Sequence, residues 1–164
     1  MKDMFVLMSI VKEKLNGDSL KMEILFDDRE GKSVEVMMKL VDEKMLMCRT
    51  RLSEGDYVVG DVCIERKTID DFCESIIDKR LENQVIRMKE KHRRVIVIIV
   101  GNIKDRTIDI HENCILGIIS KLLAEYDVSV VCVNDEFQFL YLIKRIFERF
   151  EELNSKINIV EEMK

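Results

Sequence analysis

The sequence contains no apolar run of 18 residues and no small-residue cleavage site after its short apolar stretch at residues 4–11. A helix needs about 20 consecutive apolar residues to cross a bilayer, so we expect no membrane-spanning segment. A signal peptide is also not expected, because a cleavage site should follow its apolar region. We therefore do not expect a membrane among the partners of this protein.

The sequence has no Cys-x-x-Cys pair, and the two histidines, His92 and His111, have no paired cysteines nearby. This excludes the usual spacing of a zinc site. The cysteines are odd in number and scattered along the chain: Cys48, Cys63, Cys73, Cys114 and Cys132. The pattern predicts reduced thiols in an intracellular protein rather than a disulfide framework.

The 164 residues are 47% hydrophobic and 36% charged, which indicates one globular domain rather than a disordered chain. The net charge of −5 argues against a nucleic-acid-binding protein, since phosphate contacts come from Lys and Arg. Residues 79–106, however, hold nine Lys or Arg and three Asp or Glu, a local charge of +6. This stretch is either a solvated face or a DNA-binding surface.

Residues 55–71, GDYVVGDVCIERKTIDD, place acids and a lysine within a run that alternates like a strand. Strands favour Val, Ile and Tyr and contain few acids, so these charged residues need another explanation. A tight turn at Gly60-Asp61 would fold the run into a hairpin. That hairpin would bring Asp56 beside Glu65.

The hairpin predicts a divalent-cation site. Side chains alternate along a strand, so Lys67 shares a face with Glu65 and Arg66 points to the opposite face. Mg²⁺ is often held by one or two carboxylates together with water and substrate phosphate, and Asp56 and Glu65 could supply those carboxylates. Lys67 could orient an attacking water or stabilise charge on a phosphate.

Three motifs resemble the signature of the XPF/Hef family of structure-specific DNA endonucleases. The first is the series Gly55-Asp56, Glu65-Arg66-Lys67 and Asp71. Upstream, ILFDDRE at residues 24–30 is similar to the family's first core strand, and downstream SIIDKRLENQ at residues 75–84 is similar to its segment with Arg and Leu followed by Gln. The resemblance covers about residues 21–150 and implies an α/β, restriction-endonuclease-like fold, with a mixed sheet and helices on both faces.

The resemblance implies a hydrolase of DNA repair or recombination that depends on Mg²⁺ or Mn²⁺. It would cut phosphodiesters in branched DNA, near duplex–single-strand junctions such as flaps and forks. Asp56 and Glu65 would hold the metal, Asp27 and Glu30 would reach it through water or supply a further ligand, and Lys67 would position the nucleophile.

Further positions have alternative roles. Arg80 and Gln84 would contact the DNA backbone. Arg66 either contacts the substrate or forms a salt bridge with Asp70 or Asp71. Asp71 is either a possible site residue or a residue of the helix start, paired with a capping threonine.

Two other functions remain open at this stage. One is a non-catalytic, nuclease-fold partner subunit of a heterodimeric endonuclease. The other is a restriction-type or repair nuclease that has the same metal site but a different substrate. Retention of the acids and the lysine of the motif argues against the non-catalytic subunit.

The secondary-structure pattern alternates strands and helices. We expect strands at residues 21–27, 46–52, 57–59, 62–64, 95–100 and 128–133, and helices at 34–45, after Lys67, after Arg80, and at about 111–126 and 136–153. The run VIVIIV at residues 95–100 is typical of a central strand buried on both faces.

We expect an N-terminal extension at residues 1–20, a nuclease domain at 21–153 and a polar, frayed tail at 154–164. The sequence has no Gly-rich helix-hairpin-helix pair, which family members generally carry. The chain is therefore expected to be a minimal nuclease, a fragment, or the partner of a helix-hairpin-helix protein. The resemblance also implies the nucleus for a eukaryotic source and the cytoplasm for an archaeal one.

The helix at residues 136–153 has an apolar surface too wide for one core-facing stripe. It is either wedged between layers or forms the interface of a homo- or heterodimer, which the family resemblance also implies. In the dimer interpretation, Phe139 and Ile143 lie on its outer face.

Overall fold

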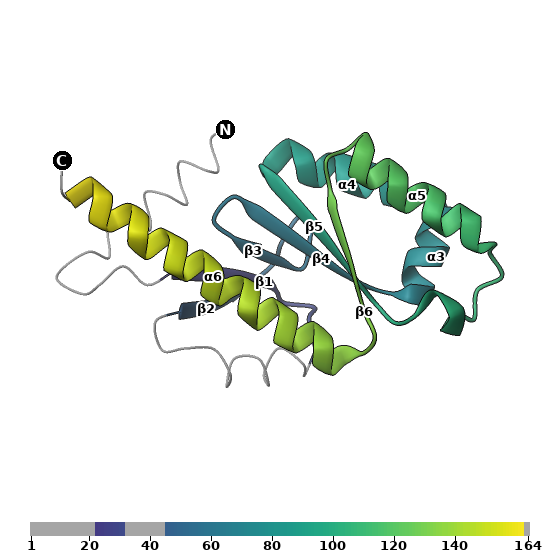
Figure 1. The fold of residues 1–164 in the computed structure, drawn as a ribbon, viewed down its shortest axis with the longest axis horizontal. Coiled ribbons are helices and arrows are strands. Elements are labelled where there is room, and N and C mark those ends of the chain that lie inside the picture. Colours follow the sequence, from purple (N-terminus) through teal and green to yellow (C-terminus); the bar gives the residue numbers. More distant parts are fainter. Residues whose placement is uncertain (1–21, 32–44, 163–164) are drawn as a thin grey trace.

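A six-stranded mixed sheet with helices on both faces forms the centre of the protein (Figure 1). The computed structural model describes residues 22–31 and 45–162. The expected extension at residues 1–20 lies outside these residues. So does the expected helix at 34–45, apart from Met45, which begins a strand.

The strand order in the sheet is β2-β1-β3-β4-β5-β6, and only the hairpin strand β3 runs opposite to its neighbours. The strands are β1 (Met22–Asp27), β2 (Met45–Thr50), β3 (Tyr57–Val59), β4 (Val62–Thr68), β5 (Arg94–Val100) and β6 (Ser129–Val133). The helices are α3 (Ile69–Ile77), α4 (Arg80–Lys91), the short 3-10 helix η1 (Ile103–Asp105), α5 (Glu112–Ala124) and α6 (Glu136–Glu162).

Each face of the sheet has its own apolar core. Helices α3, α4 and α5 pack on one face, where the buried residues include Cys63, Val85 and Ile115. Helix α6 crosses the other face, where Ile64 and Phe147 are fully buried. The predicted α/β mixed sheet with helices on both faces is confirmed, and so is the deeply buried strand β5.

The start of α3 is capped by its own sequence. The Thr68 hydroxyl oxygen accepts a hydrogen bond from the Asp71 backbone N–H at 3.1 Å, and the hydroxyl donates to the Asp71 carboxylate at 2.7 Å. This reciprocal pair confirms that Asp71 belongs to the helix start. The expected break before α4 is also present, because Lys79 has a left-handed backbone with φ of 56°.

Two expectations about the last helix are wrong. Phe139, Ile143 and Phe147 are fully buried, so Phe139 and Ile143 face the sheet and not the outside. Because the apolar surface of the helix is wide, the sequence does not reveal which part of it faces the sheet. The part that does is the stripe of Phe139, Ile143 and Phe147, which are spaced four residues apart. The helix also continues to Glu162 through most of the expected frayed tail, which has no Gly or Pro to end it.

Within the part of the chain that the structure describes, no helix is long and apolar enough to span a membrane.

Candidate active site on the β3–β4 hairpin

The hairpin between β3 and β4 brings together the two acids that the sequence places nine positions apart. Tyr57 pairs with Ile64 across the hairpin, so Asp56, the preceding residue, lies opposite Glu65. The Asp56 backbone N–H donates to the Ile64 carbonyl at 2.9 Å, and its carbonyl accepts from the Asp27 N–H at 2.8 Å. Asp56 is therefore fixed to both neighbouring strands.

Gly55 allows the chain to enter this hairpin. Its φ is +75°, a left-handed conformation that side chains disfavour. A Cβ atom at this position would lie 2.3 Å from the Cys63 sulfur. Glycine is therefore required immediately before Asp56 for two reasons, the backbone conformation and the close approach of β4.

The alternation along β4 sends its charged side chains to the predicted faces. Glu65 contacts Gln84 of α4 and also Lys67, so these side chains lie on the face covered by α3, α4 and α5. Arg66 instead contacts Glu136 of α6, on the opposite face. The predicted division of these charged residues between the two faces is confirmed.

Glu65 is almost fully buried, and one of its two carboxylate oxygens is engaged. Its Oε1 accepts a hydrogen bond from Gln84 Nε2 at 2.6 Å and lies 3.0 Å from Lys67 Nζ. No described residue donates to Oε2. The Asp56 carboxylate is similar, because its Oδ2 accepts the Arg66 backbone N–H at 2.7 Å and no described residue donates to Oδ1. Each acid thus keeps one oxygen for a ligand.

Burial raises the pKa of Asp56 to about 8, and the neighbouring charge of Glu65 is the second cause. The Arg66 backbone N–H acts in the opposite direction, because it stabilises the charged carboxylate. Two ionised carboxylates in one poorly solvated place repel each other. A cation between them would remove this repulsion.

The donor chemistry of this pair fits a hard divalent cation. The available atoms are carboxylate oxygens, and Mg²⁺ commonly uses one or two carboxylates with water and phosphate filling the remaining positions. Among the described residues, no group of three or more His, Cys, Asp or Glu is arranged to hold a metal by itself. A cation at Asp56 and Glu65 would thus need water or substrate oxygens as further ligands.

Asp27 does not join the pair as a third open carboxylate. Its Oδ1 accepts from the Arg29 backbone N–H at 3.0 Å and from Arg29 Nε at 2.5 Å, and its Oδ2 accepts from Arg29 and from the Leu52 N–H, each at 2.9 Å. The Arg29 side chain is the main cause that lowers the pKa of Asp27 below its usual range. Asp27 therefore remains ionised and held in place.

Glu30 is hydrogen-bonded to Tyr57, whose ring lies in the apolar core under α6. Its Oε2 accepts the Tyr57 hydroxyl at 2.8 Å, and the buried Tyr57 ring lies about 6 Å from the rings of Phe139 and Phe147. The Glu30 charge contributes to raising the pKa of Asp56. The predicted roles of Asp27 and Glu30 toward a metal remain predictions.

The expected salt bridge from Arg66 to Asp70 or Asp71 is wrong. Arg66 forms an ion pair with Glu136, and its guanidinium carbon lies 5.3 Å from the centre of the Phe139 ring. The reason is the alternation of β4, which directs Arg66 to the α6 face, whereas Asp70 and Asp71 belong to α3 on the other face.

The two α3 acids have partners of their own. Asp70 accepts hydrogen bonds from the backbone N–H of Thr107 at 2.8 Å and from its hydroxyl at 2.7 Å, which anchors the loop after β5. Asp71 is occupied by the cap described above. Neither contacts Glu65, and Asp71 as a site residue remains a prediction.

Helix α4 places Gln84 next to Glu65, and Arg80 lies at the first residue of the same helix. Gln84 bonds directly to Glu65, a contact that the sequence did not predict. Arg80 lies one turn earlier on the same helix face. Its side chain is exposed and lies 3.3 Å from Asp78. Arg80 is thus accessible to a substrate, and DNA contact by Arg80 or Gln84 remains a prediction.

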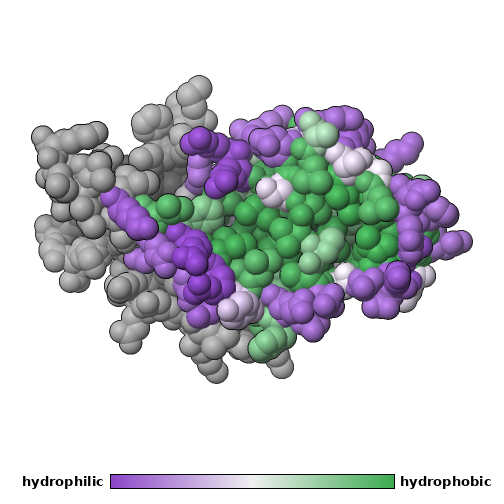
Figure 2. Space-filling view, viewed as in Figure 1, coloured by the Kyte–Doolittle hydropathy of each residue, from purple (hydrophilic) through white to green (hydrophobic). Residues whose placement is uncertain are grey.

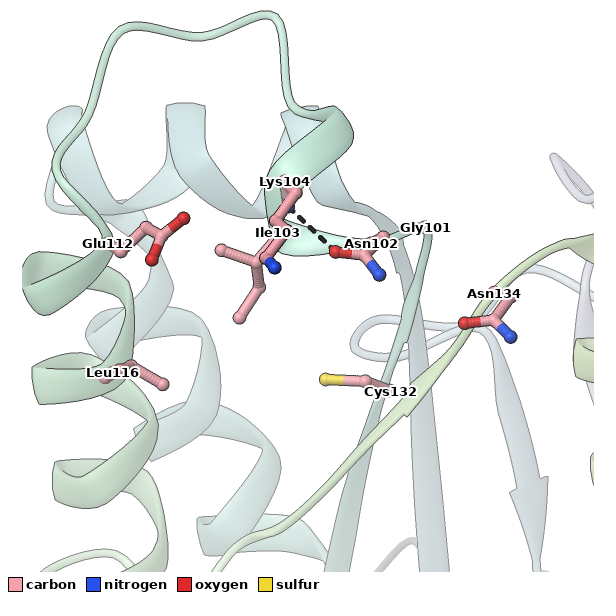
Figure 3. Close-up of a pocket in the computed structure, with 8 residues that line it drawn as sticks. All are labelled: Gly101, Asn102, Ile103, Lys104, Glu112, Leu116, Cys132 and Asn134. Carbon is pink, nitrogen blue, oxygen red and sulfur yellow. Dashed lines mark hydrogen bonds between the residues drawn. The ribbon is translucent and has the colours of Figure 1, made fainter.

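A pocket of ≈ 290 Å³ lies elsewhere, at the carboxyl ends of β5 and β6 (Figure 3). It is lined by Gly101, Asn102, Ile103, Lys104, Glu112, Leu116, Cys132 and Asn134. None of the predicted site residues lines this pocket. The acid pair and this pocket are therefore separate features.

The sequence matches the ERCC4 domain over residues 26–146. It is 31% identical over 137 residues to the 3′-flap repair endonuclease Xpf of Saccharolobus solfataricus, a match that covers 82% of this chain and 58% of the relative. It is also 31% identical over 139 residues to a putative ATP-dependent RNA helicase of Methanocaldococcus jannaschii, covering 84% of this chain and 17% of that protein. The chain thus spans less than two thirds of the length of either relative.

The structure is similar to XPF from Aeropyrum pernix. In the complex with DNA, the TM-score is 0.69 with 25% sequence identity, and the match covers 82% of this chain and 66% of that chain. For a second structure of XPF from the same organism, the TM-score is 0.72 with 24% identity, covering 83% and 68% of the two chains.

The ERCC4 match includes the whole hairpin and most of the described sheet and helices, and the similarity to XPF covers 82% of this chain. The chain therefore belongs to the ERCC4 domain family and has the fold of an XPF-type nuclease domain.

Proposed function

We propose that this chain is a metal-dependent, structure-specific DNA endonuclease that cuts phosphodiesters near flaps and forks, in DNA repair or recombination. The observation that carries the proposal is the Asp56–Glu65 pair, with one open oxygen on each carboxylate and Lys67 3.0 Å from Glu65. The family membership of the chain supports the same reaction.

Asp56 and Glu65 would hold Mg²⁺ or Mn²⁺. When bound there, the cation would supply charge neutralisation at the scissile phosphate and acidify a water molecule. Gln84 holds Glu65 in one orientation through its 2.6 Å hydrogen bond. Lys67 is mostly buried against Glu65, and its ammonium group would stabilise the charge that develops on the phosphate being cut.

DNA would approach over helix α4. Arg80 is exposed at the start of this helix, and Arg87, two turns later, lies 2.8 Å from Glu54. The helix ends with the basic residues Lys89 and Lys91. Helical spacing places Arg80, Arg87 and Lys91 on one side of α4, and these side chains would supply contacts with a phosphate backbone although the whole chain is acidic.

The test of this proposal uses labelled 3′-flap, fork, nicked and plain duplex DNA with Mn²⁺ or Mg²⁺. We expect cleavage of the branched substrates near the junction and little cleavage of the plain duplex. The full-length protein should lose this activity in EDTA. Equal cutting of all four substrates would contradict junction specificity, and tight binding of a second subunit without any cleavage would favour a non-catalytic partner role.

We also propose that a second copy of this chain binds over β6 and the start of α6. Figure 2 shows a broad apolar area around β6, between α5 and the start of α6. Phe137 is 79% exposed and Tyr141, one turn later on α6, is 62% exposed, while Val131 of β6 and Leu123 of α5 are also exposed. β6 is the last strand of the sheet within residues 22–31 and 45–162, so no described strand pairs with its outer edge. A self-complementary face of this kind fits a two-fold dimer.

Replacing both Phe137 and Tyr141 with lysine is expected to convert a dimer into a monomer, because charges would be buried in the apolar contact. Light scattering of the wild type should give twice the mass of the variant. Leu46→Lys, at an exposed position on β2 at the opposite end of the sheet, is the control and should leave the mass unchanged. A wild-type protein with the mass of one chain would contradict the dimer.

A further inference from the structure

An ion pair connects β4 of the hairpin to α6, on the face of the sheet that α6 covers. Arg66 Nε lies 3.2 Å from Glu136 Oε2, and the terminal Arg66 nitrogen NH2 bonds to the same oxygen. The guanidinium also stacks over the ring of Phe139, one helical turn after Glu136. Arg66 is therefore fixed by two residues of the first turns of α6.

Arg66 also contacts the acid pair, through its backbone. Its N–H donates to Asp56 Oδ2 at 2.7 Å, and this is the sole hydrogen bond to the Asp56 carboxylate within the described residues. The side chain of one residue thus contacts α6 on one face, while its backbone orients a carboxylate of the site. Arg66 therefore links the position of Asp56 to the Arg66–Glu136 ion pair.

Glu136 depends strongly on its partner. Its Oε1 is buried and accepts no hydrogen bond from any described residue, its Oε2 bonds to Arg66, and the side chain as a whole is 38% exposed. When one partner of a part-buried ion pair is removed, the other loses its hydrogen bonds and can change its conformation. A change at Glu136 is therefore expected to release the Arg66 side chain, and the backbone N–H of Arg66 bonds to the Asp56 carboxylate.

We propose that Glu136 is a positioning residue that fixes Arg66 and, through the Arg66 backbone, orients Asp56 for cation binding. This inference rests on the proposed metal-dependent function. It assigns Arg66 to the support of the site and not to contact with DNA. Supporting residues behind a metal ligand commonly contribute ten- to a hundred-fold, roughly, to metal affinity or activity.

The test compares the full-length wild type with Glu136→Gln, which keeps the shape of the side chain and removes its charge. Mn²⁺ binding to the protein alone is measured by calorimetry, and cleavage of a flap substrate gives kcat and KM. We expect Glu136→Gln to lower Mn²⁺ affinity and kcat by about ten-fold each while KM for DNA stays the same.

Glu148→Gln is the matched control. Glu148 lies on the same helix and pairs with Lys144 at 2.7 Å and Arg145 at 2.6 Å, away from the hairpin. It undergoes the same chemical change and should leave Mn²⁺ affinity and kcat unchanged. Arg66→Lys, which keeps the charge but loses the planar two-nitrogen contact, should fall between the wild type and Glu136→Gln.

A double-variant cycle separates positioning from DNA contact. If the pair acts as one unit, Arg66→Gln and Glu136→Gln together should lower Mn²⁺ affinity no further than either alone. An unchanged Mn²⁺ affinity in Glu136→Gln would overturn the proposal, and so would an Arg66→Gln variant that raises only KM for DNA.

The proposed function can fail independently of this inference. A wild type that binds Mn²⁺ but cuts no DNA would contradict the nuclease function, while the binding comparison would still test Glu136. A wild type that binds no Mn²⁺ would overturn both proposals.

Discussion

Replacing Asp56 with asparagine is expected to lower metal-dependent cleavage by about 1,000-fold, because the variant loses one of the two carboxylates available to the cation. Asparagine keeps the size of the side chain and an oxygen for the Arg66 N–H, which now lies 2.7 Å from Asp56 Oδ2. The fold should therefore persist. The measurement is the single-turnover rate on a flap substrate with Mn²⁺, together with the circular dichroism spectrum.

Asp61→Asn provides the control for this variant. Asp61 lies in the exposed turn of the same hairpin, so the substitution changes the same charge without touching the acid pair. It should cut at the wild-type rate. If Asp56→Asn itself cut at that rate, the assignment of Asp56 as a ligand would be wrong.

The Asp56→Asn variant should also change the pH dependence of the stability of the protein in a defined direction. Because the pKa of Asp56 rises from 3.8 to about 8 on folding, the folded state binds the proton more tightly than the unfolded state. Without metal, Asp56 therefore makes the free energy of unfolding fall as pH rises from about 4 to 8. Asp56→Asn removes this slope, so its thermal midpoint should exceed that of the wild type near pH 8 and approach it near pH 4.

Lys67→Met is expected to lower cleavage by about 100-fold while the protein still binds Mn²⁺, because the ammonium acts on the phosphate and not as a ligand. The lysine stem is mostly buried and its Nζ lies 3.0 Å from Glu65. Methionine keeps most of this packing volume and removes the charge. Removing the cation beside Glu65 should leave metal affinity unchanged or raise it.

Kinetics and calorimetry together test this separation. Lys121→Met is the control, because Lys121 also forms a close ion pair, 2.6 Å from Glu82, but belongs to α5. It should cut DNA normally. A Lys67→Met variant that loses Mn²⁺ affinity to the same extent as Asp56→Asn would contradict the assigned role, as would one that keeps the full cleavage rate.

The features that the sequence predicts well are those set by local rules. The hairpin, the facing of Asp56 and Glu65, and the opposite direction of Arg66 follow from turn residues and the two-residue period of a strand. The capping of α3 by Thr68 likewise follows from a four-residue motif. These features needed no knowledge of contacts between distant segments.

The features that the sequence does not predict depend on contacts between distant segments. Glu136 is 70 positions from Arg66, and an acid in the first turn of a helix is common for electrostatic reasons alone, so nothing in the sequence marks it as a partner. The 2.6 Å contact of Gln84 with Glu65 depends on how α4 lies on the sheet. The sequence likewise does not predict that Arg29 folds back onto Asp27, whose role toward a metal remains a prediction.

The most direct test of the account is a crystal of the full chain soaked in Mn²⁺ and measured at a wavelength that gives anomalous scattering from manganese. We expect one strong peak within bonding distance of both the Asp56 and the Glu65 carboxylates, with Lys67 Nζ nearby. A peak at other residues only, or no peak while the two carboxylates stay as they are, would contradict the claim that this hairpin is a cation site.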